Sequence, residues 1–337
     1  MAHELDFSKG QAAIAYRGAT PWHGLGEHIL PSDDLSTIQY KAGLDYDVKR
    51  AIVKYDRAII DTDNTERSLL VDDTGSHVLY RSDTGSALSI VSPRYQIVQP
   101  KQIIEFYRDL TEKFGFELEV VGALKGGRKV WALANTKNAV QLRGKDDVKG
   151  YLLLATSYDG SMSTQARMTS VRVVCNNTLT YADRHGRAEV VVPHSTAFDA
   201  DKVKLDLKIG EAWEAFAANA ATMTDRIVSR DETIRMLMDV YFNLTSTDDI
   251  KAFQADPRNE KTAEKLMARM TTALFESPGS QLASARGTLW GVLNAVTYDV
   301  DFQAPSRSND GRLDKSWFGT GAAIKNRAWN AAMRMVA

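Results

Sequence analysis

The chain of 337 residues contains a single cysteine, Cys175, and this scarcity excludes several classes of protein. One thiol forms no internal disulfide framework, and it supplies too few ligands for a cysteine-rich metal site. No apolar run approaches the roughly 20 residues of a membrane-spanning helix. The first thirty residues carry Asp6, Lys9, Arg17 and Glu27 and lack the apolar core of a secretion signal. We therefore expect a globular protein of the reducing cytoplasm.

Sequence signatures of catalysis are equally scarce. No Gly-x-x-x-x-Gly-Lys-Ser/Thr motif is present, so the common phosphate-binding loop of nucleotide hydrolases is absent. His23 and His28 lack the His-Glu-x-x-His pattern of a zinc enzyme, and we expect no metal site. Cys175 could act as a nucleophile beside a histidine, but a lone cysteine that follows two valines is more typical of a small buried residue. We predict a protein that is not an enzyme and needs no cofactor.

The chain also has no large excess of charge of either sign, since its formal net charge is −1. The charges are nevertheless segregated, with acidic residues prevailing over residues 32–75 and basic residues over residues 125–149. The basic residues of the second segment are Lys125, Arg128, Lys129, Lys137, Arg143, Lys145 and Lys149, with Trp131 among them. Such a mixture is typical of a groove that follows a phosphate backbone and stacks bases. Lysine-rich hairpins that prevent edge-to-edge aggregation have the same composition.

Three regions follow one another along the chain. Residues 1–99 alternate short β-like runs, such as 48–55, 76–80 and 87–91, with turns rich in Asp, Gly and Ser. Residues 100–200 contain a helix predicted over 100–114, ended by Gly115, and then an antiparallel sheet. Residues 201–337 are predicted to be helical because apolar residues recur at helical spacing. The three regions could also form one continuous domain.

Two predicted hairpins form the sheet of the middle region. Strands over 116–124 and 128–136 are joined by Lys125-Gly126-Gly127, and strands over 150–157 and 161–168 flank Tyr158-Asp159-Gly160. Glycine provides the positive φ that tight turns require. A run over 188–192 that ends at Pro193 is predicted to add an edge strand. The expected fold class is α+β: an antiparallel β-meander packed against helices, followed by a mainly helical C-terminal region.

Two polar motifs have more than one interpretation. Arg172, Asn176 and Asn177 lie where strand-forming valines give way to turn or helix-cap residues. Their donors are suited to phosphate, and they are equally suited to satisfying buried carbonyl groups. Trp22 and His23 lie in a segment whose proline and glycines predict a fixed turn. Trp22 would then fill the core or dock on a neighbouring subunit.

Three segments carry a family resemblance. They are Thr20-Pro21-Trp22-His23-Gly24-Leu25-Gly26, Thr169-Ser170-Val171-Arg172-Val173-Val174-Cys175-Asn176-Asn177-Thr178-Leu179 and Thr288-Leu289-Trp290-Gly291-Val292-Leu293-Asn294-Ala295-Val296-Thr297. Through them the chain resembles, over nearly its whole length, a phage- and plasmid-encoded family catalogued as domain of unknown function 932. The resemblance implies a protein expressed with phage genes inside a bacterial host. It implies no particular chemistry.

The predicted outline is also similar to that of the annealing-recombinase superfamily, which includes phage Redβ, Erf and the eukaryotic Rad-type annealing proteins. That similarity implies binding of single-stranded DNA, or of RNA, without ATP, assembly into a ring or filament, and pairing of complementary strands. For such a groove we predict phosphate contacts from Lys125, Arg128, Lys129, Arg143 and Lys145, stacking by Trp131 or Tyr158, and deeper contacts from Arg167 and Arg172. If strand alternation buries Trp131 with Leu133, its stacking role is lost.

Two hypotheses about function follow. In the first, the protein anneals DNA, and a phage exonuclease or a single-strand-binding protein is an expected partner, whereas a membrane is not. In the second, a non-enzymatic phage protein binds or inhibits a host or rival protein factor through its acidic N-terminal surface, for which a near-neutral net charge is suited. The basic segment over residues 125–149 favours the first hypothesis.

Overall fold

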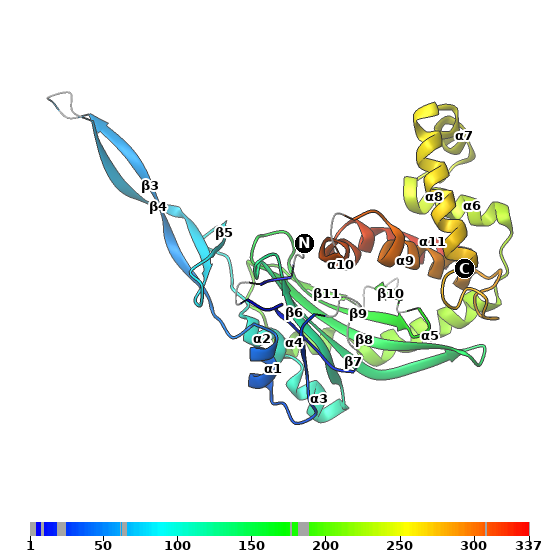
Figure 1. Ribbon diagram of the computed structural model, residues 1–337, viewed down its shortest axis with the longest axis horizontal. Coiled ribbons are helices and arrows are strands. Elements are labelled where there is room, and N and C mark those ends of the chain that lie inside the picture. Colours follow the sequence, from blue (N-terminus) through cyan, green and yellow to red (C-terminus); the bar gives the residue numbers. More distant parts are fainter. Residues whose placement is uncertain are drawn as a thin grey trace.

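The structure is a computed structural model that describes residues 5–7, 10–18, 25–60, 62, 66–175, 177–180, 189–306 and 309–336. Figure 1 shows a projecting two-stranded arm, a central sheet and a group of C-terminal helices. The predicted α+β class is confirmed. One apolar core joins residues from all three predicted regions, among them Leu79, Leu152 and Phe216.

The central sheet is built from the predicted hairpins. Its strand order is β10-β9-β8-β7-β6-β1-β2, and β11 also pairs with β9. β6 pairs antiparallel with β7, and β8 with β9, as predicted, and β11 is the expected additional strand. β7 and β8 also pair, so that β6 to β9 form one meander. The bounds are β1 (Ile14–Tyr16), β2 (Glu27–His28), β6 (Glu117–Leu124), β7 (Lys129–Leu142), β8 (Asp146–Ser157), β9 (Thr164–Arg172), β10 (Asn177–Thr180) and β11 (Glu189–Val192).

Helices pack on the sheet and on one another. They are α1 (Leu35–Lys41), α2 (Pro100–Glu105), α3 (Arg108–Phe114), α4 (Ala200–Asp206), α5 (Ile209–Asp225), α6 (Arg230–Phe242), α7 (Thr247–Ala255), α8 (Pro257–Phe275), α9 (Leu289–Tyr298), α10 (Asn309–Phe318) and α11 (Thr320–Val336), with a π-helix at Asp299–Gln303. The helix predicted over 100–114 is two helices, α2 and α3. Gly115 ends α3 with a φ of 69°, the left-handed value that favours glycine.

Both faces of the sheet are covered. Along β7, Val130, Ala132 and Ala134 point to the core shared with α2 and α5. Trp131 and Leu133 point to the opposite face, where a second apolar cluster includes the N-terminal Leu5. Leu313, Trp317 and Phe318 of α10 pack on this second cluster. A strand buried on both faces leaves few side chains of the sheet open to a ligand.

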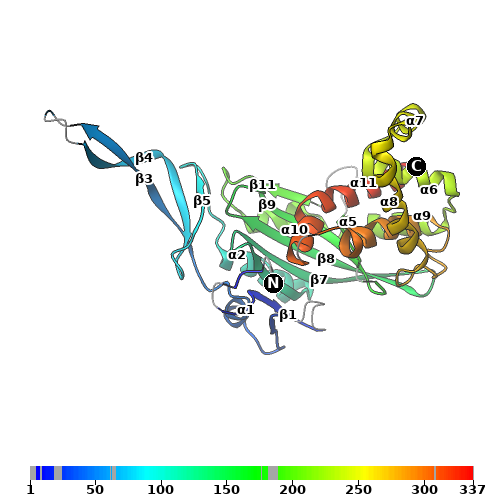
Figure 2. The same ribbon diagram turned by 45° about the horizontal axis from the view of Figure 1, so that its top comes forward.

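The arm is a hairpin of β3 (Val48–Ile60) and β4 (Glu66–Arg81), and β5 (Ala87–Val91) pairs only with its root, at residues 77–80. Thirteen residues of β3 span about 44 Å, and Figures 1 and 2 show the outer part extending away from the body. Four acidic residues of the segment over residues 32–75 belong to the two strands, namely Asp56, Glu66, Asp72 and Asp73, whereas Asp33, Asp34, Asp45 and Asp47 lie outside helices and strands. A ribbon that is solvated on both faces tolerates acidic residues at any position.

Candidate nucleic-acid interface

The basic segment over residues 125–149 does not form one surface. Lys125, Arg128 and Lys129 lie at the β6–β7 end, whereas Arg143 and Lys145 lie at the β7–β8 turn (Figure 1). β7 has 14 residues, so these two ends are about 45 Å apart. The prediction of a single groove from this segment is therefore wrong, because an extended strand separates residues that are close in sequence.

Lys125 and Lys129 are bound to a carboxylate of the protein itself. The Nζ atom of Lys125 lies 2.6 Å from an oxygen of Asp314, and that of Lys129 lies 2.5 Å from the other oxygen. The Lys129 side chain is 7% exposed and also lies over the Phe318 ring. Both lysines thus hold α10 on the sheet, and a phosphate would have to compete with Asp314 for them.

Trp131 and Tyr158 are buried, which contradicts their predicted stacking role. Trp131 is 2% exposed and packs edge-to-face against Trp317, with ring centroids 5.2 Å apart. Tyr158 is fully buried, and its hydroxyl donates a hydrogen bond of 2.8 Å to the carbonyl oxygen of Val98. Burial raises the pKa of the Tyr158 hydroxyl well above its usual value. Neither ring offers a face to a base.

Arg172 lies in a buried polar network and not on the surface. Its Nε and Nη2 atoms each lie 2.7 Å from oxygens of Asp146, which is completely buried. Asp146 also accepts hydrogen bonds from Ser284, at 2.6 Å, and from the Trp290 indole, at 3.1 Å. Arg172 further donates to the carbonyl oxygen of Gly279. Of the two interpretations of Arg172, the structure bears out the satisfaction of buried groups.

Two of the segments that carry the family resemblance meet at this network. The side-chain amide of Asn177 donates a hydrogen bond of 3.0 Å to the carbonyl oxygen of Asn294. Arg172 and Trp290 are linked in turn because both donate hydrogen bonds to Asp146. Their motifs therefore join β9 and β10 to α9. The sequence signal for this junction was an acidic residue, Asp146, within a strongly basic segment. Trp22, His23 and Asn176 lie outside the described residues.

Arg167 is also paired within the protein. Its Nε atom lies 2.7 Å from Glu189, so the ion pair ties β9 to β11, and the Arg167 side chain is 14% exposed. Arg143 pairs with Asp225 but remains 41% exposed. Lys145 and Arg128 are exposed. Of the predicted phosphate contacts, Arg128, Arg143 and Lys145 thus keep the exposure that such a contact requires.

Cys175 does not have the surroundings of a reactive thiol. It is 7% exposed, and burial raises its pKa, which disfavours the thiolate. The Nη1 atom of Arg172 lies 4.0 Å from the sulfur, and the same guanidinium is engaged in the network with Asp146. His194 instead stacks on Tyr95, with ring centroids 4.4 Å apart.

A second buried network was not predicted from the sequence. Lys325 of α11 donates hydrogen bonds of 2.8 to 2.9 Å to Asp301, Thr178 and Ser316. Burial lowers the pKa of this lysine. The group links β10, the π-helix, α10 and α11, so we assign it a structural role. No local sequence pattern brings these four residues together.

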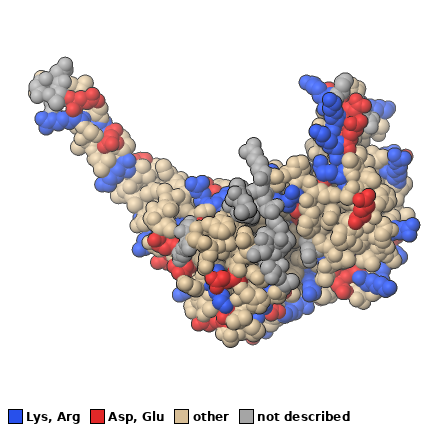
Figure 3. All heavy atoms as spheres, viewed as in Figure 1, with Lys and Arg blue, Asp and Glu red and all other residues tan. Residues whose placement is uncertain are grey.

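Two groups of basic residues remain exposed. One lies at the root of the arm and the other on α8, and these two parts of the fold stand on opposite sides of a hollow in the surface. At the root of the arm, Arg128 and Lys54 line a groove of about 490 Å³ together with the aliphatic Ile52 and Ile90. On the opposite side, Arg258, Lys261 and Lys265 of α8 are exposed and spaced by three and four residues, which places them on one helix face. Figure 3 shows the surface hollowed between the arm and the α7–α8 projection, and both carry basic and acidic residues.

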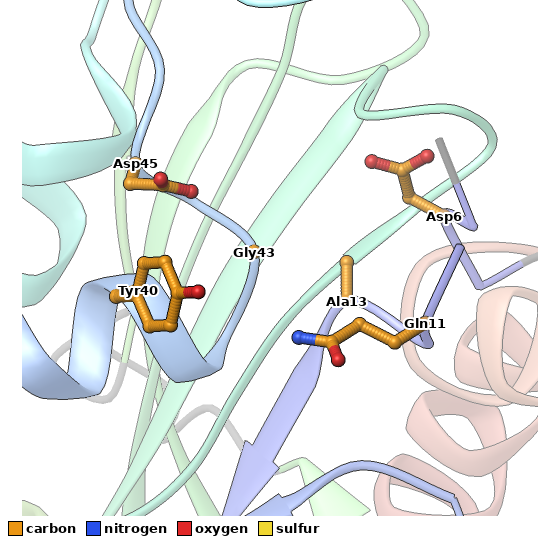
Figure 4. A pocket seen from close by; sticks show the side chains of 6 residues that line it. All are labelled: Asp6, Gln11, Ala13, Tyr40, Gly43 and Asp45. Atoms are coloured by element: carbon orange, nitrogen blue, oxygen red, sulfur yellow. The ribbon is translucent and has the colours of Figure 1, made fainter. Parts of the chain in front are cut away.

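A smaller pocket of about 150 Å³ lies between the N-terminal segment and the end of α1 with the residues that follow it (Figure 4). Asp6 and Gln11 line one side, and Tyr40 and Asp45 the other. Asp6 is bound to the buried guanidinium of Arg81, so its charge is already neutralised. Across the described residues, no group of three His, Cys, Asp or Glu side chains is placed to hold a metal ion. Among the same residues, no helix is both long and apolar enough to cross a membrane.

The fold and these surfaces define an α+β protein with exposed basic residues at the root of its arm and on α8. Residues 87–317 match the model of a family described as domain of unknown function (DUF932), and the chain belongs to this family. The match begins at β5, so it includes neither β3 and β4 of the arm nor α11. No curated protein and no solved structure matches the chain. The similarity to annealing recombinases therefore stays a prediction.

Proposed function

We propose that this protein binds single-stranded DNA without ATP and, as an oligomer, pairs complementary strands. The observation that carries the proposal is the exposure of Arg128 at the root of the arm and of Lys261 and Lys265 on α8. The arm and the α7–α8 projection stand on the two sides of the hollow (Figure 3). These residues come from segments far apart in the sequence. Cations in such an arrangement are suited to following a flexible, evenly charged backbone.

In this proposal the strand crosses the hollow from the root of the arm to α8. Arg128 binds a phosphate at the root, and so does Lys54, whose Nζ atom lies 3.0 Å from Asp72 and would exchange this exposed carboxylate for the phosphate. Bases contact Ile52 and Ile90, which are 46% and 66% exposed. Lys261 and Lys265 bind phosphates on the other side. Because these contacts are electrostatic and weak, several subunits along one strand would be needed for high affinity.

The test is fluorescence anisotropy of a labelled oligothymidine at low and moderate salt. Changing Arg128, Lys261 and Lys265 to Ala removes three exposed charges from the proposed path. We expect at least an order-of-magnitude loss of affinity, and a plot of log affinity against log salt that is shallower by about 2 units, from about 0.7 per phosphate contact. Annealing of complementary oligonucleotides without ATP should be lost in parallel.

The matched control changes Arg143, Lys145 and Lys149 to Ala, which removes the same charge around the far end of the β7–β8 hairpin. This variant should bind as the unmodified protein does. Equal losses in both variants would point to unspecific attraction by net charge, and absence of binding at either salt would refute the proposal.

Binding of a protein factor is the second candidate function, and the arm favours it. Tyr55 and Leu69 lie on one face of the ribbon and Leu70 on the other, according to the β3–β4 register. They are 50%, 43% and 58% exposed, respectively. Apolar side chains in such a position are typical of a protein contact. If this protein does not bind oligothymidine, the exposed apolar residues of the arm are the first surface to test for binding of a protein.

A further inference from the structure

A groove of about 720 Å³ at the outer side of the C-terminal helices is rich in arginine. It is lined by residues of α6, the start of α7 and α11, and we call it the α6–α11 groove. Its charged residues are Arg226, Arg235, Arg327, Arg334, Glu232 and Asp239. The groove therefore has two more cations than anions.

Two of the arginines are paired within the groove. Arg226 lies 2.5 Å from Glu232, and Arg334 lies 2.6 Å from Asp239. Together with hydrogen bonds from Ser229, the contact with Arg226 lowers the pKa of Glu232 to about 2, so this acid is ionised at neutral pH. The excess positive charge consequently belongs to Arg235 and Arg327.

Arg327 and Arg235 differ in how they present that charge. The Nε atom of Arg327 donates a hydrogen bond of 2.7 Å to the carbonyl oxygen of Val240, in the last turn of α6. This bond fixes the plane of the guanidinium, which is an arrangement suited to a carboxylate. Arg235 is exposed and has no ion pair within the described part of the chain. It is thus available to an incoming anion.

The remaining lining is aliphatic or thioether in character. Met236 and Ala331 are buried, and Leu244, Ile250 and Met335 are half-buried. No aromatic ring is among the described residues that line the groove, so its floor offers only aliphatic and thioether contacts. Flexible methionines beside Leu and Ile are suited to aliphatic side chains of varied shape.

We propose that the α6–α11 groove binds an acidic peptide segment of a partner protein. Its carboxylates would pair with Arg235 and Arg327, and its aliphatic side chains would enter between Met236, Leu244 and Ile250. The guanidinium plane of Arg327, fixed by its bond to Val240, and the aliphatic floor favour this ligand class, and binding of a nucleic acid is an outcome of the test below. The proposal does not depend on DNA binding in the hollow, whose proposed contacts are residues of β3, β5, the β6–β7 turn and α8.

The experiment measures anisotropy of a short fluorescein-labelled peptide of alternating aspartate and leucine, added to the full chain. Two comparison peptides replace leucine by serine or aspartate by lysine. We expect the aspartate–leucine peptide to bind best, and Arg235→Glu to weaken its binding by about tenfold, which corresponds to about 1.4 kcal/mol. Circular dichroism and thermal unfolding should show that Arg235→Glu folds normally, since the residue is exposed.

The matched control is Arg230→Glu, which makes the same charge change on the same helix but outside the groove lining. It should leave peptide affinity unchanged. The proposal is overturned if the aspartate–leucine peptide does not bind or binds no better than the serine peptide, or if Arg230→Glu weakens it equally. It is also overturned if Arg235→Glu abolishes oligothymidine binding, which would make the groove a nucleic-acid site. If only the variant that lacks Arg128, Lys261 and Lys265 loses oligothymidine binding, the proposed peptide site is unaffected. The two proposals can therefore be refuted independently.

Discussion

Arg172 and Asp146 form a buried ion pair at the end of β9 and the start of β8, with 2.7 Å between the arginine Nε atom and a carboxylate oxygen. Because Asp146 also accepts hydrogen bonds from Ser284 and Trp290, the pair anchors α9 and the loop before it to the sheet. The cost of removing both charges from water is offset by an almost complete set of partners.

Asp146→Asn should therefore destabilise the protein strongly. It leaves the Arg172 guanidinium buried without a countercharge, and we expect the free energy of unfolding to fall by about 3–5 kcal/mol. Urea unfolding followed by circular dichroism measures the loss. The neighbouring Asp147 is exposed, and Asp147→Asn should change the same quantity by no more than about 0.5 kcal/mol. Similar losses in the two variants would contradict the role assigned to Asp146.

Substitutions of Trp131 should affect stability and not DNA binding. Trp131→Ala leaves a cavity against Trp317, and we expect a loss of about 3–5 kcal/mol. Trp131→Phe should cost much less, because the buried indole Nε1 atom has no hydrogen-bond partner in the structure and its removal leaves no new group unsatisfied. Thermal unfolding compares the two variants. If the folded Trp131→Phe protein lost affinity for oligothymidine, stacking by this ring would have to be reconsidered.

The stability of the protein should depend on the protonation of His194. Burial lowers the pKa of His194, so the unfolded chain binds a proton more readily than the folded protein. The free energy of unfolding should accordingly decrease as the pH falls below about 6.5, and this decrease should end once the pH is below the folded pKa. Urea unfolding of His194→Gln over this range should give a flatter pH profile. An unchanged profile would assign the proton uptake to other groups.

Removal of the outer arm should leave the body folded. In the variant, residues 54–72 are replaced by an Asn-Gly turn that joins Val53 to Asp73, while β5 keeps its pairing with residues 77–80. We expect an unchanged melting temperature and a smaller hydrodynamic radius, measured by differential scanning calorimetry and gel filtration. Oligothymidine affinity should fall severalfold because Lys54 is lost. A large drop in melting temperature would show that the arm belongs to the same cooperative unit as the body.

The hairpins of the central sheet could be predicted because their signals are local. Lys125-Gly126-Gly127 and Asp159-Gly160 supply the positive φ values that their turns adopt. The positions of the functional candidates could not be predicted in the same way. Lys129 and Trp131 are buried by α10, which comes about 180 residues later in the chain, and strand periodicity does not reveal what covers the outer face.

The inner ends of the arm were predicted as the β-like runs 48–55 and 76–80, but its outer part was missed for a different physical reason. Strand patterns in a sequence arise because one face is buried, and a two-stranded ribbon outside the core has no such constraint. Its acidic residues consequently resembled loop residues. Arg128 was correctly predicted to be an exposed cation. Its proximity to Lys54 depends on β3, and no sequence pattern indicated the full length of that strand.

The outer part of the β3–β4 ribbon is long and extends away from the body, so it should unfold locally while the rest of the protein stays folded. Amides of β8 lie in the core of the sheet and should exchange their hydrogen for deuterium only on global unfolding, whereas those of the outer ribbon should exchange by local fraying. Because the ribbon pairs two strands that follow each other in the chain, it can re-form within about microseconds after each opening. The amides of the body should therefore exchange slowly, whereas those of the outer arm should exchange rapidly because the arm repeatedly opens and re-forms. A partner that binds the arm would be detected as slower exchange of the arm amides.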